Sequence, residues 1–132
     1  MRLGIVGMLP GDFRSFGISH FEAIRALGFT GGGFHLPGDL TPEMTPEDIR
    51  RCRSLFVDYE IDLVQMGIGY AECLFDPDDE VRQHVTEKIN RTIPIAAALS
   101  AQYILIRPGS MNPKGSWTPH RDNFTADAWN RL

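Results

Sequence analysis

The sequence is poor in the features that mark secreted, membrane-spanning and nucleic-acid-binding proteins. Its 132 residues include two cysteines, Cys52 and Cys73, which are too few for a disulfide framework or a paired metal knuckle, so we expect a cytoplasmic protein. No apolar run approaches the roughly 18 residues of a membrane span, and we expect no membrane partner. The formal net charge is −4, whereas a nucleic-acid partner calls for a basic surface. We therefore expect no nucleic acid among the partners.

Phosphate-binding glycine motifs are also missing. The pairs Gly31/Gly33 and Gly67/Gly69 each begin a dinucleotide-type G-x-G, but another residue stands where the third glycine belongs. The sequence contains no P-loop and no G-x-S-x-G nucleophile elbow. We therefore expect no nucleotide cofactor.

What is present is an alternation of short apolar runs with amphipathic segments. The length suits a single domain, residues 1–132, that can bury a core. Apolar strands followed by helices are typical of an α/β protein with a parallel sheet covered by helices. The apolar runs predict four strands, at 2–8, 31–36, 61–67 and 103–109.

Side chains that cap helices predict where the intervening helices begin. Such residues have an oxygen that accepts a hydrogen bond from the first helical turn. Pro94 lies inside the third helix, which it should kink or break. The predicted caps are Ser19, Thr45, Asp76 and Thr125.

Polar residues recur near the carboxyl ends of the predicted strands, where α/β proteins bind ligands. Strict alternation places His35, Gln65 and Arg107 at similar height on one face of the sheet. On the third strand it also groups Leu63 with Gln65 and opposes them to Val64. The three polar residues are candidate ligand contacts. The alternatives are a hydrogen-bonded rim histidine for His35 and a barrel-filling amide for Gln65.

Arg107 is the strongest of these candidates because a buried guanidinium needs a partner. It follows three apolar residues and precedes Pro108, which favours extended backbone before it. Either an anionic or carbonyl oxygen of a ligand meets Arg107, or a carboxylate of the protein does. Glu72, just past the third strand, is the candidate carboxylate.

A long segment rich in Gly, Pro, Ser and Asn follows Arg107, and loops of this length often close over a ligand. Ser110 lies at its start. Trp117 could stack on a sugar and His120 could donate or accept a hydrogen bond. The alternative is a proline-stiffened surface loop whose tryptophan packs on a neighbouring helix.

Three segments carry a resemblance to a known group of enzymes: "MRLGIVGML" at the start, "HFEAIRALGFTGGGFHLPG" at 20–38, and "YILIRPGSMNPKGSWTPHRDNFTADAWNRL" at 103–132. They resemble the amino-terminal half of the xylose isomerase-like (β/α)8 barrels, the sugar phosphate isomerase/epimerase superfamily. The resemblance implies a TIM barrel of which this chain has about four βα units, a half-barrel.

The resemblance also implies an activity. Such enzymes use a divalent metal ion to polarise the oxygens of a small sugar or hydroxy-keto substrate, while a carboxylate moves a proton beside the carbonyl. Their metal ligands and acid/base glutamates sit mostly on later strands, beyond this chain, so we assign no catalytic and no metal residue here. We expect this chain alone to be inactive. The substrate-binding candidates are His35, Gln65, Arg107, Ser110, Trp117 and His120.

Two alternatives remain open. A DNA repair enzyme like endonuclease IV would need zinc-binding histidines at early strand ends, but "VQMGIG" and "ILIRPG" have none. A small, non-catalytic α/β binding or interaction module is the other alternative. Four strands would leave two unpaired sheet edges and an open apolar face carrying Leu3 or Val6, Leu63 and Leu105. We therefore expect self-association or a missing carboxyl-terminal half.

Overall fold

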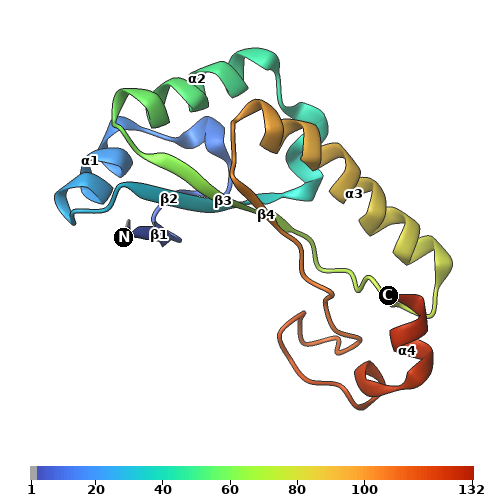
Figure 1. Ribbon diagram of the computed structural model, residues 1–132. Coiled ribbons are helices and arrows are strands. Elements are labelled where there is room, and N and C mark those ends of the chain that lie inside the picture. The colour runs from blue at the N-terminus through green and yellow to red at the C-terminus, as the bar shows by residue number, and fades with distance from the viewer. Residues whose placement is uncertain (1–2) are drawn as a thin grey trace.

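The computed structural model describes residues 3–132 and shows a parallel four-stranded sheet in the order β1-β2-β3-β4 (Figure 1). The predicted α/β fold with a parallel sheet is confirmed. The strands are β1 (Gly4–Val6), β2 (Gly31–Pro37), β3 (Asp62–Gly69) and β4 (Tyr103–Leu105). The α-helices are α1 (Ile18–Ala26), α2 (Pro46–Asp58), α3 (Asp79–Ala98) and α4 (Ala126–Arg131), with 3-10 turns η1 (Phe13–Ser15), η2 (Gly38–Glu43) and η3 (Arg121–Phe124).

The first and last strands are shorter than predicted. Arg2, the predicted first residue of β1, lies outside the described residues. The predicted strand 103–109 ends at Leu105, so Arg107 follows β4 rather than ending it. No helix within residues 3–132 is long and apolar enough to cross a membrane.

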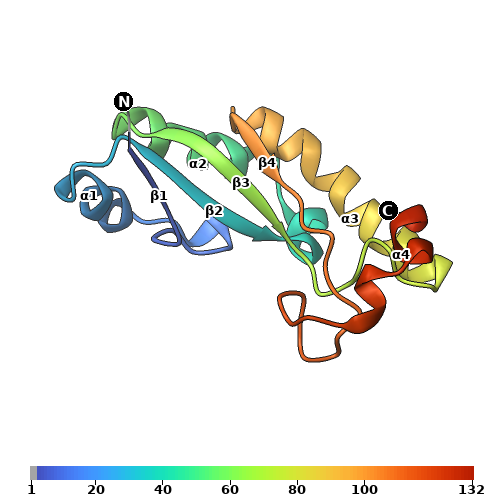
Figure 2. The same cartoon turned by 60° about the horizontal axis from the view of Figure 1, so that its bottom comes forward.

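Helices α1, α2 and α3 cover one face of the sheet, and the opposite face carries no helix in the described chain (Figures 1 and 2). Phe34 and Leu36 of β2 point into the core between sheet and helices, as alternation predicts. Cys52 lies in this core, and both it and Cys73 are buried free thiols. The helices therefore bury one face of the sheet, and the other face is open.

A β-bulge in β3 overturns the predicted alternation on that strand. Gly32 pairs with Leu63 and Gly33 pairs with Gln65, so Val64 is an extra residue in the register. Leu63 is buried against the helices, whereas Val64 and Gln65 both face the open side. The predicted pairing of Leu63 with Gln65 on one face is therefore wrong, and Leu63 does not belong to the open apolar face.

Two of the four predicted helix caps are confirmed. Thr45 Oγ1 accepts from the backbone N–H of Asp48 at 3.1 Å, and Thr125 Oγ1 accepts from that of Ala128 at 3.2 Å. Asp48 completes a capping box by accepting from the Thr45 N–H at 3.0 Å.

The other two caps are wrong. The cap of α1 is Gly17, whose N–H donates to the His20 ring at 3.0 Å, so Ser19 lies inside the helix. Asp78 caps α3, since its side chain accepts from the Glu80 N–H. Asp76 instead accepts from the Asp78 N–H and closes a turn before the helix. Pro94 does not break α3, which continues to Ala98.

Candidate functional site

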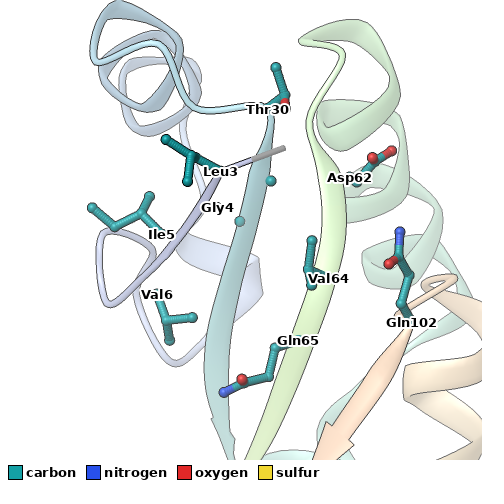
Figure 3. A pocket seen from close by; sticks show the side chains of 11 residues that line it. Leu3, Gly4, Ile5, Val6, Thr30, Asp62, Val64, Gln65 and Gln102 are labelled. Atoms are coloured by element: carbon teal, nitrogen blue, oxygen red, sulfur yellow. The ribbon is translucent and has the colours of Figure 1, made fainter. Parts of the chain in front are cut away.

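A cavity of about 460 Å³ opens on the helix-free face of the sheet (Figure 3). It lies toward the amino ends of the strands, opposite to the end where α/β proteins bind ligands. In a closed barrel this face is a packed interior rather than a site. The lining residues are Leu3, Gly4, Ile5, Val6, Thr30, Gly31, Gly32, Asp62, Val64, Gln65 and Gln102.

The strand register separates His35 from Gln65. His35 pairs with Gly67, while Gln65 pairs with Gly33 and lines the cavity described above. The two side chains are therefore two residues apart along the direction of the strands, and the prediction of similar height is wrong. His35 is exposed on the open face, and its ring occupies the space that a Cβ at Gly67 would need.

Arg107 lies just beyond β4, at the carboxyl end of the sheet, and is half-buried. One Nη donates to the backbone carbonyl of Tyr70 at 2.9 Å. The Cζ atom is 5.6 Å from the centre of the Tyr70 ring and 5.3 Å from the centre of the Trp117 ring, so both rings make cation–π contacts. The Nε atom is buried and has no hydrogen-bond partner in the described protein.

Tyr70 fixes the backbone at this point as well. Its hydroxyl accepts from the Arg107 N–H at 3.0 Å and donates to the Arg107 carbonyl. Burial raises the pKa of Tyr70, so its hydroxyl keeps the proton that it donates. The sequence analysis missed Tyr70, although a tyrosine just past a buried strand is a usable signal.

Glu72 is not the partner of Arg107. Its carboxylate pairs with Lys88 of α3, which also lies 2.9 Å from a carboxylate oxygen of Asp39. Lys88 is 5% exposed and ties the segment after β2 to the segment after β3. Burial acts to raise the pKa of Glu72, but the hydrogen bond from Lys88 and its other contacts hold that pKa below 4.5. This second cluster was also missed.

The loop after Arg107 is held by Ser110, which is buried. Its hydroxyl donates to the Thr118 carbonyl at 2.7 Å and accepts from Asn123 Nδ2 at 2.9 Å and from the Asn112 N–H at 3.1 Å. These bonds place Ser110 inside the loop as a support for it.

Trp117 and His120 lie further along the same loop. The Trp117 side chain is 80% exposed and contacts Arg107. The His120 ring caps η3, where its Nδ1 accepts from the Asp122 N–H at 3.4 Å. Of the six predicted contacts, the structure brings Arg107 and Trp117 together.

The divalent metal that the resemblance implies does not fit the residues present. Within residues 3–132, no group of three or more His, Cys, Asp or Glu side chains is placed to hold a metal ion. His35 and His120 lie on different elements, and the carboxylate of Glu72 is engaged by Lys88. We therefore derive no reaction step through a metal on these residues.

Comparison with protein-family models gives no match, and comparison with the curated proteins gives none either. Two solved structures match in fold. One is D-psicose 3-epimerase in the presence of D-fructose, with TM-score 0.65 and 19% identity. The other is D-psicose 3-epimerase with D-tagatose from Clostridium cellulolyticum H10, with TM-score 0.67 and 16% identity. Each match covers 99% of this chain and 44% of the other, so the chain spans less than half the length of these enzymes. The four βα units therefore have the fold of about half of a TIM barrel.

Proposed function

We propose that this chain is the sugar-binding half of an isomerase or epimerase barrel. The fold supports this proposal, because the matched structures are sugar epimerases by their titles. The observation that carries it is the contact between Arg107 and Trp117 beyond β4. This pair lies at the end of the sheet where parallel α/β proteins bind small molecules.

The side chains at this end suit a small sugar-like substrate. Trp117 exposes a flat ring of the kind that packs against the apolar face of a sugar. Arg107 supplies N–H donors for sugar oxygens, and His35 adds an exposed ring nitrogen on the open face. Ser110 contributes indirectly by holding the loop that carries Trp117 and His120. Gln65 lies lower on the open face and contacts only a substrate that reaches into the barrel.

Proton transfer beside a carbonyl is the reaction class that the resemblance implies for the complete barrel. The described residues offer no group of three or more His, Cys, Asp or Glu side chains that could hold a metal ion. In this proposal the chain binds and orients the substrate, and the acid/base groups and metal ligands come from residues outside it.

A fluorescence titration tests the proposal with the two tryptophans as matched reporters. Trp117 and Trp129 are both exposed, but only Trp117 contacts Arg107. D-Fructose and D-tagatose should change the emission of the wild-type chain and of Trp129→Phe in a saturable way. The same sugars should leave the emission of Trp117→Phe unchanged. A response that persists in Trp117→Phe, or no response in any of the three proteins, would refute sugar binding at this site.

A non-catalytic binding module is the second candidate. It is favoured by the closed core between the sheet and α1 to α3, which the four strands build without help from further strands. Failure of every sugar to bind, together with a stable monomer in solution, would support this alternative.

A further inference from the structure

The backbone ladder between β3 and β4 stops before the chain reaches Arg107. Its last pair joins Gly67 to Leu105, where β4 ends. β3 itself continues to Gly69, and these last residues pair with β2 alone. If the register continued, Arg107 would stand level with Gly69. The backbone N–H and carbonyl of Arg107 therefore lie where a ladder would pair them, and they need other partners.

The Tyr70 hydroxyl supplies both of these partners. It accepts a hydrogen bond from the Arg107 N–H at 3.0 Å and donates one to the Arg107 carbonyl. The guanidinium of Arg107 adds a third bond to the same residue, because one Nη donates to the Tyr70 carbonyl at 2.9 Å. Within residues 3–132, all hydrogen bonds of Arg107 go to Tyr70. One side chain therefore takes the place of a step of the β-ladder.

Tyr70 is itself fixed in the core between the sheet and α3. It is 6% exposed and belongs to the same buried cluster as Ile68 of β3 and Val85 and Ile89 of α3. A ring packed in such a cluster has little space to move, so its hydroxyl stays in one place. Tyr70 thus joins a rigid part of the molecule to the backbone of Arg107.

The position of Trp117 depends on Tyr70 through Arg107. The Arg107 Cζ atom lies 5.3 Å from the centre of the Trp117 ring, which is otherwise largely exposed. The loop has a further tie to the segment after β3, because the Leu74 N–H donates to the Pro108 carbonyl at 2.8 Å. That bond holds the backbone after Arg107 and does not touch the guanidinium. Loss of the Tyr70 hydroxyl should therefore release Arg107 and leave the loop attached.

We propose that Tyr70 is a positioning residue of the sugar site. Its hydroxyl holds the backbone of Arg107, and thereby keeps the guanidinium and the Trp117 ring in the arrangement that binds the sugar. Tyr70 acts through Arg107 and not by contact with the sugar, because its ring is buried and its hydroxyl bonds Arg107 twice. This inference rests on the proposed function and adds to it a residue on β3's side of the site.

Fluorescence titration of the full 132-residue chain with D-fructose tests the inference in the Trp129→Phe background, where Trp117 is the only tryptophan. Tyr70→Phe should weaken D-fructose binding about three- to tenfold, the effect of one or two lost hydrogen bonds. Tyr103→Phe is the matched control, because it removes the hydroxyl of an exposed tyrosine on β4 and should leave the affinity unchanged. Circular dichroism shows that each variant is folded during the titration. A purely structural role would lower stability without changing the affinity of the folded chain.

Amide hydrogen exchange of the wild-type chain is the second measurement, and it decides the matter if Tyr70→Phe fails to fold. The Arg107 amide should exchange at least about tenfold more slowly than an unprotected amide, because it donates to Tyr70. Exchange at the unprotected rate, or equal affinities of Tyr70→Phe and Tyr103→Phe, would overturn the positioning role and leave the proposed function standing. Absence of D-fructose binding in the Trp129→Phe chain would overturn the proposed function and this inference with it.

Discussion

Lys88 shows how a single residue fixes the end of the sheet where the candidate site lies. It occupies the buried stripe of α3 beside Val85 and Ile89. Its Nζ meets two carboxylates from two different strand-to-helix segments. Because the lysine is almost fully buried, its loss would leave the Glu72 charge with little compensation.

Lys88→Met should lower the free energy of unfolding by about 1–3 kcal/mol, since Glu72 keeps only partial access to water. Urea unfolding followed by circular dichroism measures the change. Arg50→Met is the matched control, because it removes a cation from an exposed ion pair with Glu47 and should have little effect. Equal losses of unfolding free energy in both variants would show that the buried Lys88 cluster stabilises the fold no more than an exposed ion pair does.

The same cluster predicts a pH dependence. The hydrogen bond from Lys88 lowers the pKa of Asp39, and the pKa of Glu72 is also below its ordinary 4.5. A lowered carboxylate pKa stabilises the fold above the ordinary value and loses that effect as the pH falls through the folded-state pKa. The difference in the free energy of unfolding between wild type and Lys88→Met should therefore be largest at about pH 6 to 7. It should shrink as the pH falls below about 4.5. A gap that stays constant down to pH 3, roughly, would contradict the assignment.

Sequence reasoning at the residue scale identified Arg107 and its need for a partner, but not the partner. A guanidinium after an apolar run predicts burial and pairing. The contacts come from Tyr70, 37 residues earlier, and from a loop residue ten positions later. Glu72 was the expected carboxylate, and Lys88 takes it. Whether Glu72 pairs with Arg107 or with Lys88 depends on distances in the folded chain, which cannot be predicted from the spacing of these residues in the sequence.

At the scale of elements, glycines of β2 and β3 show how closely the two strands approach. A Cβ at Gly33 would lie 2.7 Å from the backbone carbonyl oxygen of Gln65 in β3. A Cβ at Gly67 would instead meet the ring of His35, which is exposed and can turn away. The backbone of β3 therefore leaves no room for a larger residue at position 33, whereas at position 67 only a movable side chain occupies the space.

Gly33→Ala should destabilise the chain by about 1–3 kcal/mol, because the sheet must shift to admit the methyl group. Gly67→Ala should cost less than about 1 kcal/mol and move the His35 ring instead. Chemical unfolding of both variants gives the comparison, and the His35 ring resonances report its displacement. A larger loss for Gly67→Ala than for Gly33→Ala would show that the His35 ring cannot turn away, and would contradict this difference between the two positions.

The same scale separates what patterns predict from what they miss. The caps Thr45 and Thr125 followed from sequence because each stands directly before an apolar-periodic segment. Ser19 and Asp76 failed because a nearby residue completes the first turn better in each case. The bulge at Val64 does not change the alternation of polar and apolar residues in the sequence. That alternation therefore could not predict which face of the sheet Leu63 occupies.

For the whole molecule, the main feature is a sheet that is closed on one face and open on the other. The predicted barrel-type fold is confirmed as half of a TIM barrel. Val6, Tyr103 and Leu105 are exposed on the open side, and β1 and β4 lack neighbours on their outer edges within the described residues. Exposed apolar surface and unpaired strand edges favour association.

We predict that the chain associates at roughly micromolar concentration through this face and these edges. A two-fold axis along the barrel would place β4 of each copy parallel to β1 of the other and close eight strands. Leu105→Lys should shift the sedimentation profile toward monomer, whereas Val57→Lys, on the outer surface of α2, should not. A wild-type chain that sediments as a monomer and melts cooperatively would contradict this prediction.

The central claim is that a sugar binds at the carboxyl end of the sheet, beside Arg107, and not in the cavity at the amino end. Two-dimensional NMR of the isotope-labelled chain, titrated with D-fructose, tests it most directly. We expect shifts of the Trp117 indole resonance and of the amides of Tyr70 and Arg107. Shifts confined to Thr30 and Gln102, which line the cavity, would contradict it.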